Sequence, residues 1–180
     1  DSLGALVDRL IIRVLALHAG EGAGALNQVT SLPAWRAYLG GKAAYRQGQY
    51  QIADSAFGEA IAADSNFALA ALADWMALDR LGEDPTIRAP VIFHNLGRLD
   101  RDDSLWYRAL SGPRYPAANL RDQIGMMDFA AGRLSDRADA WFELGDLQMH
   151  GGATVDLDRP LDRATQSFHR ALALDSSYAL

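Results

Sequence analysis

The sequence predicts an all-α fold of about nine helices arranged in antiparallel pairs. A phrase of ten residues at 60–69 returns at 171–180 with apolar or polar character kept at almost every position, which is typical of a repeat array. Elsewhere, apolar residues recur at helical spacing, and no segment shows the strict alternation of a half-buried strand. Repeated pairs of helices within one domain, residues 1–180, are therefore the predicted architecture.

The first 30 residues are predicted to form one packing helix and a connection. Apolar residues follow helical spacing over 3–15, with Ser2 as the N-cap, and this face is expected to pack on the rest of the domain. The glycine-rich run 20–24 ends the helix. It lacks the Lys-Ser/Thr pair of a phosphate-binding loop, so we interpret it as a flexible connection.

Two helix pairs are predicted next, a first repeat over 33–66 and a degenerate second repeat over 67–98. Ser31 followed by Pro33 is a helix start signal, and Gly48 is expected to turn the chain between the first two helices. The four helices are predicted at 33–46, 50–63, 67–81 and 87–96, with Asp64, Ser65 and Asn66 capping the third.

An irregular helical pair is predicted over 102–132. Its helices are expected at 105–110 and 119–131, separated by the proline-containing break at 112–116. The acidic residues before the first helix lack the ligand spacing of a calcium loop. They are expected to serve as helix caps instead, namely Asp102, Asp103 or Ser104.

The last repeat is predicted over 136–178, with an insertion between its two helices. Gly145 and Ala164, which mark the two helices, lie 19 residues apart, whereas the corresponding interval in the first repeat is 12 residues. The difference of seven residues predicts an extended inter-helix loop at roughly 151–159.

A known repeat signature is present in this part of the chain. Ala53 and Phe57 stand at the same offsets before the first copy as Ala164 and Phe168 before the second, so both read A-x3-F-x2-A-[IL]. The stretch Trp141-Phe-Glu-Leu144-Gly145 supplies the W-x2-L-G motif expected before the second copy. The chain therefore resembles the tetratricopeptide repeat family, which implies a right-handed superhelix of antiparallel helix pairs.

A narrower resemblance covers most of the chain. Residues 31–40, 44–50, 112–116 and 141–146 look like the tetratricopeptide region carried C-terminally by some bacterial Ser/Thr protein kinases and related signalling proteins. This resemblance implies a regulatory or interaction module and brings no kinase residue with it. The first copy departs from the family pattern, because Trp35 stands two residues from the usual tryptophan position.

Composition excludes several functions. The net charge is −6, with 17 basic residues scattered among 23 acidic ones, so a phosphate-binding footprint for nucleic acid is not expected. No apolar run reaches the length of a transmembrane helix. The chain has no cysteine, which excludes disulfides and thiolate chemistry. A soluble bacterial domain is expected, and both cytoplasmic and periplasmic locations agree with the composition.

Catalytic and metal-binding patterns are not found in the sequence. No G-x-S-x-G turn presents a serine nucleophile, and no HExxH motif presents a zinc site. His150 and His169 lie on the two helices of the last repeat, but a metal there would need further carboxylate ligands. We therefore expect no enzyme activity, no metal and no cofactor.

The predicted binding site is the concave groove that tetratricopeptide arrays line with the first helix of each pair. Aromatic and arginine side chains there are typical of binding hot spots. Packing of Trp35, Tyr38 and Tyr45 against neighbouring helices is the alternative for those three residues. The residues predicted to face the groove are Trp35, Tyr38, Lys42, Tyr45, Arg46, Phe142, Asp146 and Met149.

Three functions are compatible with these observations. The first is a protein-interaction or scaffold module that binds a protein or peptide partner. The second is a fixed subunit docked through its terminal helices on a larger assembly, such as a peripheral membrane complex, and the third is a groove that senses a small ligand. The chain begins without methionine and ends where another helix would open, so we expect it to be part of a larger protein.

Overall fold

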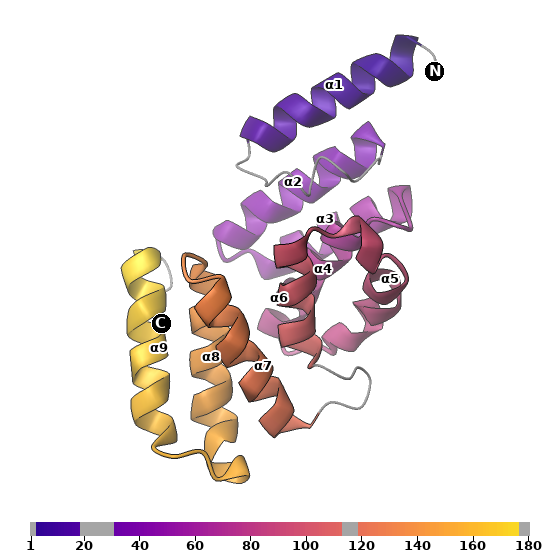
Figure 1. Cartoon of the computed structure of the whole chain (residues 1–180). Helices are drawn as coiled ribbons and strands as arrows, with labels where there is room; N and C mark the ends of the chain where they lie inside the picture. Colours follow the sequence, from indigo (N-terminus) through magenta and orange to yellow (C-terminus); the bar gives the residue numbers. More distant parts are fainter. Residues whose placement is uncertain (1–2, 19–30, 113–118, 177–180) are drawn as a thin grey trace. The chain divides into compact units, whose positions relative to one another are not determined.

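The computed structural model describes residues 3–18, 31–112 and 119–176, and in these ranges every regular element is a helix. The prediction of an all-α fold is confirmed. Two compact units are present, residues 1–104 and 105–180, and each is described by itself. Figure 1 shows the order of the helices along the chain. Whether the repeats form one continuous superhelix stays a prediction.

The helices follow the predicted order closely. Unit 1 contains α1 (Leu3–His18), α2 (Leu32–Arg46), α3 (Tyr50–Ala63), α4 (Ala68–Leu81), the 3-10 helix η2 (Pro85–Arg88), α5 (Ala89–His94) and the 3-10 helix η3 (Leu96–Arg98). The helix α6 (Arg101–Ser111) begins in unit 1 and ends in unit 2. Unit 2 continues with α7 (Leu120–Arg133), α8 (Ala138–Gly151), the 3-10 helix η4 (Gly152–Val155) and α9 (Pro160–Leu174).

The helix pair α2 and α3 packs closely because a glycine faces a phenylalanine. Gly41 is buried, and a Cβ atom at this position would lie 2.5 Å from Cε1 of Phe57. The Phe57 ring is fully buried and lies 6.0 Å from the ring of Tyr38. Only a residue without a side chain lets the two helices approach this far.

The pair α8 and α9 in unit 2 repeats this contact. A Cβ atom at Gly145 would lie 2.7 Å from Cε1 of Phe168. A buried hydrogen bond adds to the packing, because the Ser167 hydroxyl donates to Oε1 of Gln148 at 3.0 Å. Phe57 and Phe168 stand at the same offset before the two copies of the repeated phrase, so the same contact occurs in both helix pairs.

The adjacent glycines in α2 should respond in opposite ways to the same substitution. Gly41→Ala forces a methyl group against the buried Phe57 ring, and we expect the free energy of unfolding to fall by about 1–3 kcal/mol. At Gly40 no atom lies within 4 Å of the added Cβ. Gly40→Ala should therefore raise the free energy of unfolding by up to about 1 kcal/mol, because alanine has the higher helix propensity. Urea denaturation of both variants measures this, and equal effects would contradict the assigned contact.

Helix caps agree with the sequence at α2 and differ at two other helices. Ser31 caps α2 as predicted, since its Oγ accepts a hydrogen bond from the Ala34 backbone N–H at 3.3 Å. The Asp64 carboxylate accepts from the Asn66 N–H at 3.0 Å and makes a turn before α4, whose N-cap is Phe67. Capping of α4 by residues 64–66 is therefore wrong.

The cap of α6 also differs from the prediction. The Asp103 N–H donates to Oδ1 of Asp100 at 2.7 Å, so Asp100 makes the capping hydrogen bond instead of Asp102, Asp103 or Ser104. The reason is that α6 begins at Arg101, earlier than predicted. Asp102 and Asp103 lie in the first turn of the helix, where their negative charges interact favourably with the positive end of the helix dipole.

The helix predicted at 87–96 is divided into η2, α5 and η3. Asp84 caps η2, because its Oδ1 accepts from the Thr86 N–H at 2.9 Å. Pro90 then lies in the first turn of α5. Proline has no N–H to donate to a preceding carbonyl, so a continuous α-helix through this position loses a hydrogen bond.

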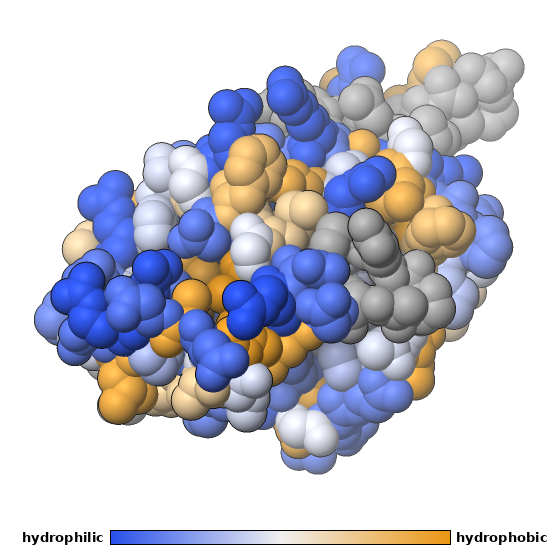
Figure 2. Space-filling view, turned by 60° about the horizontal axis from the view of Figure 1, so that its bottom comes forward, coloured by the Kyte–Doolittle hydropathy of each residue, from blue (hydrophilic) through white to orange (hydrophobic). Residues whose placement is uncertain are grey.

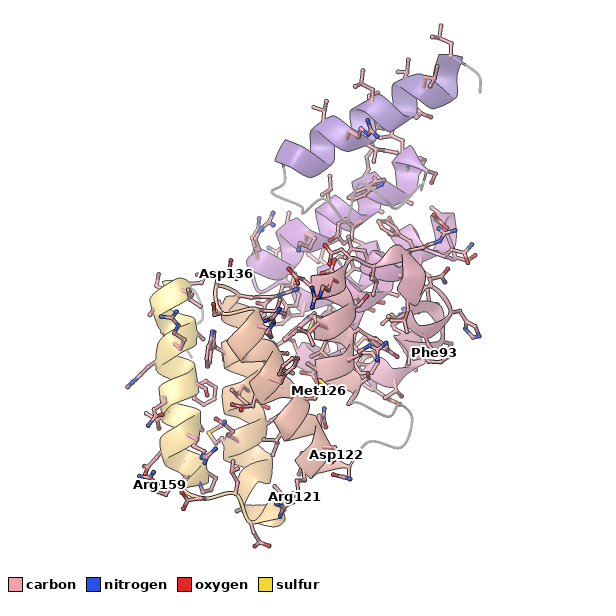
Figure 3. All side chains as sticks on the ribbon, in the orientation of Figure 1. Phe93, Arg121, Asp122, Met126, Asp136 and Arg159 are labelled. Carbon is pink, nitrogen blue, oxygen red and sulfur yellow. The ribbon has the colours of Figure 1, made fainter. Side chains whose placement is uncertain are left out.

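The insertion in the last repeat is partly helical instead of an extended loop. Gly152 to Val155 form η4, and Asp156 and Arg159 follow with positive φ angles of 53° and 47°. Arg121, labelled in Figure 3, donates a hydrogen bond from Nη2 to the Val155 carbonyl. This contact joins the insertion to α7.

The helix α1 packs on α2, as predicted for the N-terminal helix, but with a different face. Among the side chains of α1 that the structure describes, Ile12 is buried, with 7% exposure. The predicted packing face included five residues whose side chains are exposed, namely Leu3, Leu6, Val7, Leu10 and Val14. They lie on the opposite side of the helix from Ile12. Residues 19–30, 113–118 and 177–180, including the predicted connection at 20–24 and part of the break at 112–116, lie outside the described residues.

Candidate binding surface

Trp35 and Tyr38 belong to the core of unit 1, so their predicted place in an open groove is wrong. Their exposures are 0% and 1%. Trp35 packs edge-on against Tyr38 with ring centroids 5.4 Å apart, and Phe67 lies 5.4 Å from Trp35 and 5.3 Å from Tyr38. These three rings fill the space between α2 and the start of α4, because Phe67 precedes α4 and is itself fully buried.

Phe142 in unit 2 needs the same correction. Its exposure is 8%, and its ring lies 5.5 Å from Phe168. Phe142 precedes Gly145 by three residues, as Tyr38 precedes Gly41. The same position of both helix pairs is thus filled by a ring that covers the phenylalanine beneath the glycine.

The other predicted residues of unit 1 are accessible at the C-terminal end of α2. Lys42 and Tyr45 are partly exposed and Arg46 is exposed. The Lys42 ammonium lies 6.0 Å from the Tyr38 ring centroid, and the Tyr45 ring lies 5.3 Å from that of Tyr50. We call Lys42, Tyr45 and Arg46 the α2 edge. It presents two cations beside one aromatic ring, which is a composition typical of binding surfaces.

The equivalent positions of unit 2 lie 104 residues later and are also accessible. Lys42, Tyr45 and Arg46 correspond to Asp146, Met149 and His150, which we call the α8 edge. Met149 is 39% exposed, and the side chains of Asp146 and His150 are 43% and 67% exposed. Nδ1 of His150 lies 3.3 Å from Oδ1 of Asp146. The repeat offset of 104 residues from Arg46 is the sequence signal that identifies the place of His150.

The two edges carry opposite charge. The helix α2 contains Arg36, Lys42 and Arg46 and no acidic residue. The helix α8 contains Asp139, Glu143 and Asp146 and no lysine or arginine. On the face shown in Figure 2, hydrophobic residues form small groups among hydrophilic ones. Lys42 and Arg46 make the α2 edge basic, whereas Asp146 makes the α8 edge acidic.

A buried ionisable group, Asp74 in α4, was missed by the sequence analysis. Its exposure is 0%, and its Oδ2 accepts from Nε of Arg88 at 2.5 Å, while Oδ1 has no hydrogen-bond partner. Burial raises the pKa of Asp74 to about 7, the Arg88 cation opposes the rise, and the nearby Asp54 carboxylate adds to it. A single acid inside the apolar run 68–78 is the sequence signal that could have identified it.

No arrangement for metal chemistry is found in the ranges that the structure describes. Among these residues no three histidine or acidic side chains lie close enough to hold a metal ion. No described helix has the length and apolar character required to span a membrane.

Comparison with known proteins adds no assignment. No protein-family model matches this chain. A search of curated proteins also finds no match. The resemblance to tetratricopeptide repeats therefore depends on the repeated residues, together with the glycine–phenylalanine contacts that those residues make.

Proposed function

We propose that the chain is a non-catalytic interaction module of the tetratricopeptide type that binds a protein or peptide partner. The α2 edge and the α8 edge are the contact surfaces in this proposal. The remaining predicted residues, Trp35, Tyr38 and Phe142, support these surfaces from the core and do not touch the partner.

The repeated geometry of the helix pairs carries the proposal. In each pair, a glycine of the first helix rests on a phenylalanine of the second, with Gly41 on Phe57 and Gly145 on Phe168. An aromatic residue one turn earlier covers each phenylalanine. The same positions are therefore buried and the same positions accessible in both copies, which is what a repeat scaffold for binding requires.

The charges of the edges indicate the chemistry of the partner. The α2 edge belongs to a helix with three basic and no acidic residues in a chain of net charge −6. An acidic segment with an apolar or aromatic residue for Tyr45 complements it. The α8 edge, with Asp146 and His150, suits a basic segment.

Charge reversal on the α2 edge tests the proposal. We expect the variant with Lys42→Glu and Arg46→Glu to lose a partner that the wild-type chain captures from native extract, as measured by quantitative mass spectrometry. The matched control is Arg36→Glu, an exposed site on the same helix outside the edge, which should keep the partner. Circular dichroism checks that both variants are folded. Retention of every partner by the double variant would refute a role for the α2 edge.

A fixed structural subunit is the second candidate, and one observation favours it. Leu172 and Leu174, near the C-terminal end of α9, are 38% and 36% exposed. A subunit docked through this end should lose its assembly in the variant with Leu172→Asp and Leu174→Asp. The α2-edge variant should then leave the assembly intact, so the two variants distinguish the candidates.

A further inference from the structure

The outer side of α1 is an apolar stripe. Five large apolar side chains on this side are exposed to solvent, and side chains on the outer side of α1 project away from α2 in Figure 3. The stripe consists of Leu3 at 79%, Leu6 at 52%, Val7 at 47%, Leu10 at 62% and Val14 at 58% exposure.

The helix α1 is apolar on two opposite sides. Ile12 is buried where α1 packs on α2. At about 100° per residue, the stripe lies on the far side of the helix from Ile12. The described charged side chains, Asp8 and Arg13, fall outside the stripe. A helix that is apolar on both sides is typically covered on both sides, so a second surface is expected to cover the stripe.

The spacing of the stripe is symmetric about its centre. Leu3, Val7, Leu10 and Val14 are placed so that reversing the helix direction exchanges the first with the last and the second with the third. If two copies of α1 pair in antiparallel orientation, each leucine meets a valine, Leu3 against Val14 and Leu10 against Val7. A two-fold interface needs such a self-complementary patch.

The area of the stripe reaches what a dimer requires. The five exposed fractions correspond to roughly three fully exposed aliphatic side chains, or on the order of 300 Å² of apolar surface per copy. Because about 60% of a typical interface is apolar, two copies would bury on the order of 1,000 Å² in total, near the lower limit for a specific interface.

We propose that this chain forms a homodimer in which the apolar stripes of two α1 helices pair in antiparallel orientation. The occupant of the stripe is thus a second copy of the chain. This interface uses neither the α2 edge nor the α8 edge, so its failure would leave the proposed binding function untouched.

The mass of the full chain in solution tests the proposal. We expect sedimentation and light scattering at about 50 μM to give twice the chain mass of 19.5 kDa, and dilution should shift the protein toward the monomer. Leu10→Asp should abolish the dimer. The matched control is Leu161→Asp in α9, because Leu161 is 65% exposed and Leu10 is 62% exposed. That control should remain dimeric.

A complementary pair of variants tests the orientation. One variant carries Leu3→Glu with Val7→Glu, and the other carries Leu10→Lys with Val14→Lys. Each variant alone should be monomeric, because charges face apolar residues at both ends of the helix pair. Mixed together, they should form a salt-sensitive heterodimer, since antiparallel pairing places the acids of one variant opposite the bases of the other.

Three results would overturn the proposal. A monomeric wild-type chain at 50 μM would mean that the stripe binds a different molecule or another segment of the same chain. A dimer that persists after Leu10→Asp would place the interface elsewhere. Failure of the mixed variants to associate, with circular dichroism showing both folded, would exclude the antiparallel orientation.

Discussion

Replacing Trp35 with alanine is expected to lower the free energy of unfolding by about 3–5 kcal/mol. The indole is fully buried and contacts the rings of Tyr38 and Phe67, which connect α2 to the start of α4. Removing it leaves a large cavity where two helices meet. Urea denaturation followed by circular dichroism measures the loss.

Two controls separate a core role from a binding role for Trp35. Its Nε1 atom has no hydrogen-bond partner, so Trp35→Phe breaks no hydrogen bond and keeps an aromatic ring in the core. This variant should lower the free energy of unfolding less than Trp35→Ala does. Tyr45→Ala, on the α2 edge, should lower the free energy of unfolding much less than Trp35→Ala does, because Tyr45 is partly exposed. A Trp35→Ala variant as stable as the wild type would contradict its place in the core.

Stability is expected to fall as the pH rises from about 4 to 7 because of Asp74. Burial raises the pKa of this carboxyl to about 7 from its ordinary value of 3.8. The folded protein therefore binds a proton that the unfolded chain releases between these values. The stabilising contribution is complete below the unfolded pKa and is lost as the pH passes the folded pKa. The slope from this group reaches at most about 1.4 kcal/mol per pH unit.

The variant Asp74→Asn should remove that slope, since its side chain does not ionise. Urea denaturation at several pH values between 4.5 and 8 gives the free energy of unfolding of the variant and of the wild type. The difference between the two proteins at each pH cancels the contribution of the four histidines, which both contain. Asp128→Asn is the control, because Asp128 is an exposed acid on α7, and it should keep the slope. Identical slopes for the wild type and Asp74→Asn would show that Asp74 stays ionised beside Arg88.

Periodicity and repetition predicted most of the fold. The apolar pattern located the helices to within a few residues, and the repeated phrase identified the two helix pairs in which Gly41 contacts Phe57 and Gly145 contacts Phe168. These features are local or repeated, so one sequence contains enough information to find them. The single helix predicted at 87–96 is divided, because Pro90 lacks the N–H that a continuous α-helix needs at this position.

The candidate site was predicted only in part. The predicted residues Lys42, Tyr45, Arg46, Asp146 and Met149 are accessible. A tryptophan, tyrosine or phenylalanine on an amphipathic helix, however, suits a core as well as a binding surface. Burial depends on the helix that follows: Phe67 covers Trp35 and Tyr38, and no local pattern in α2 reveals this contact. The outward direction of the α1 stripe was missed for the same reason, since either apolar side could pack on α2.

The affinity of the captured partner for the wild type and for the Lys42→Glu, Arg46→Glu variant tests the central claim most directly. Titration by calorimetry, with Arg36→Glu as control, compares proteins that differ only on α2. The proposed function predicts a dissociation constant at least about tenfold weaker for the double variant and an unchanged constant for the control. Equal affinities for all three folded proteins would contradict a partner-binding role for the α2 edge.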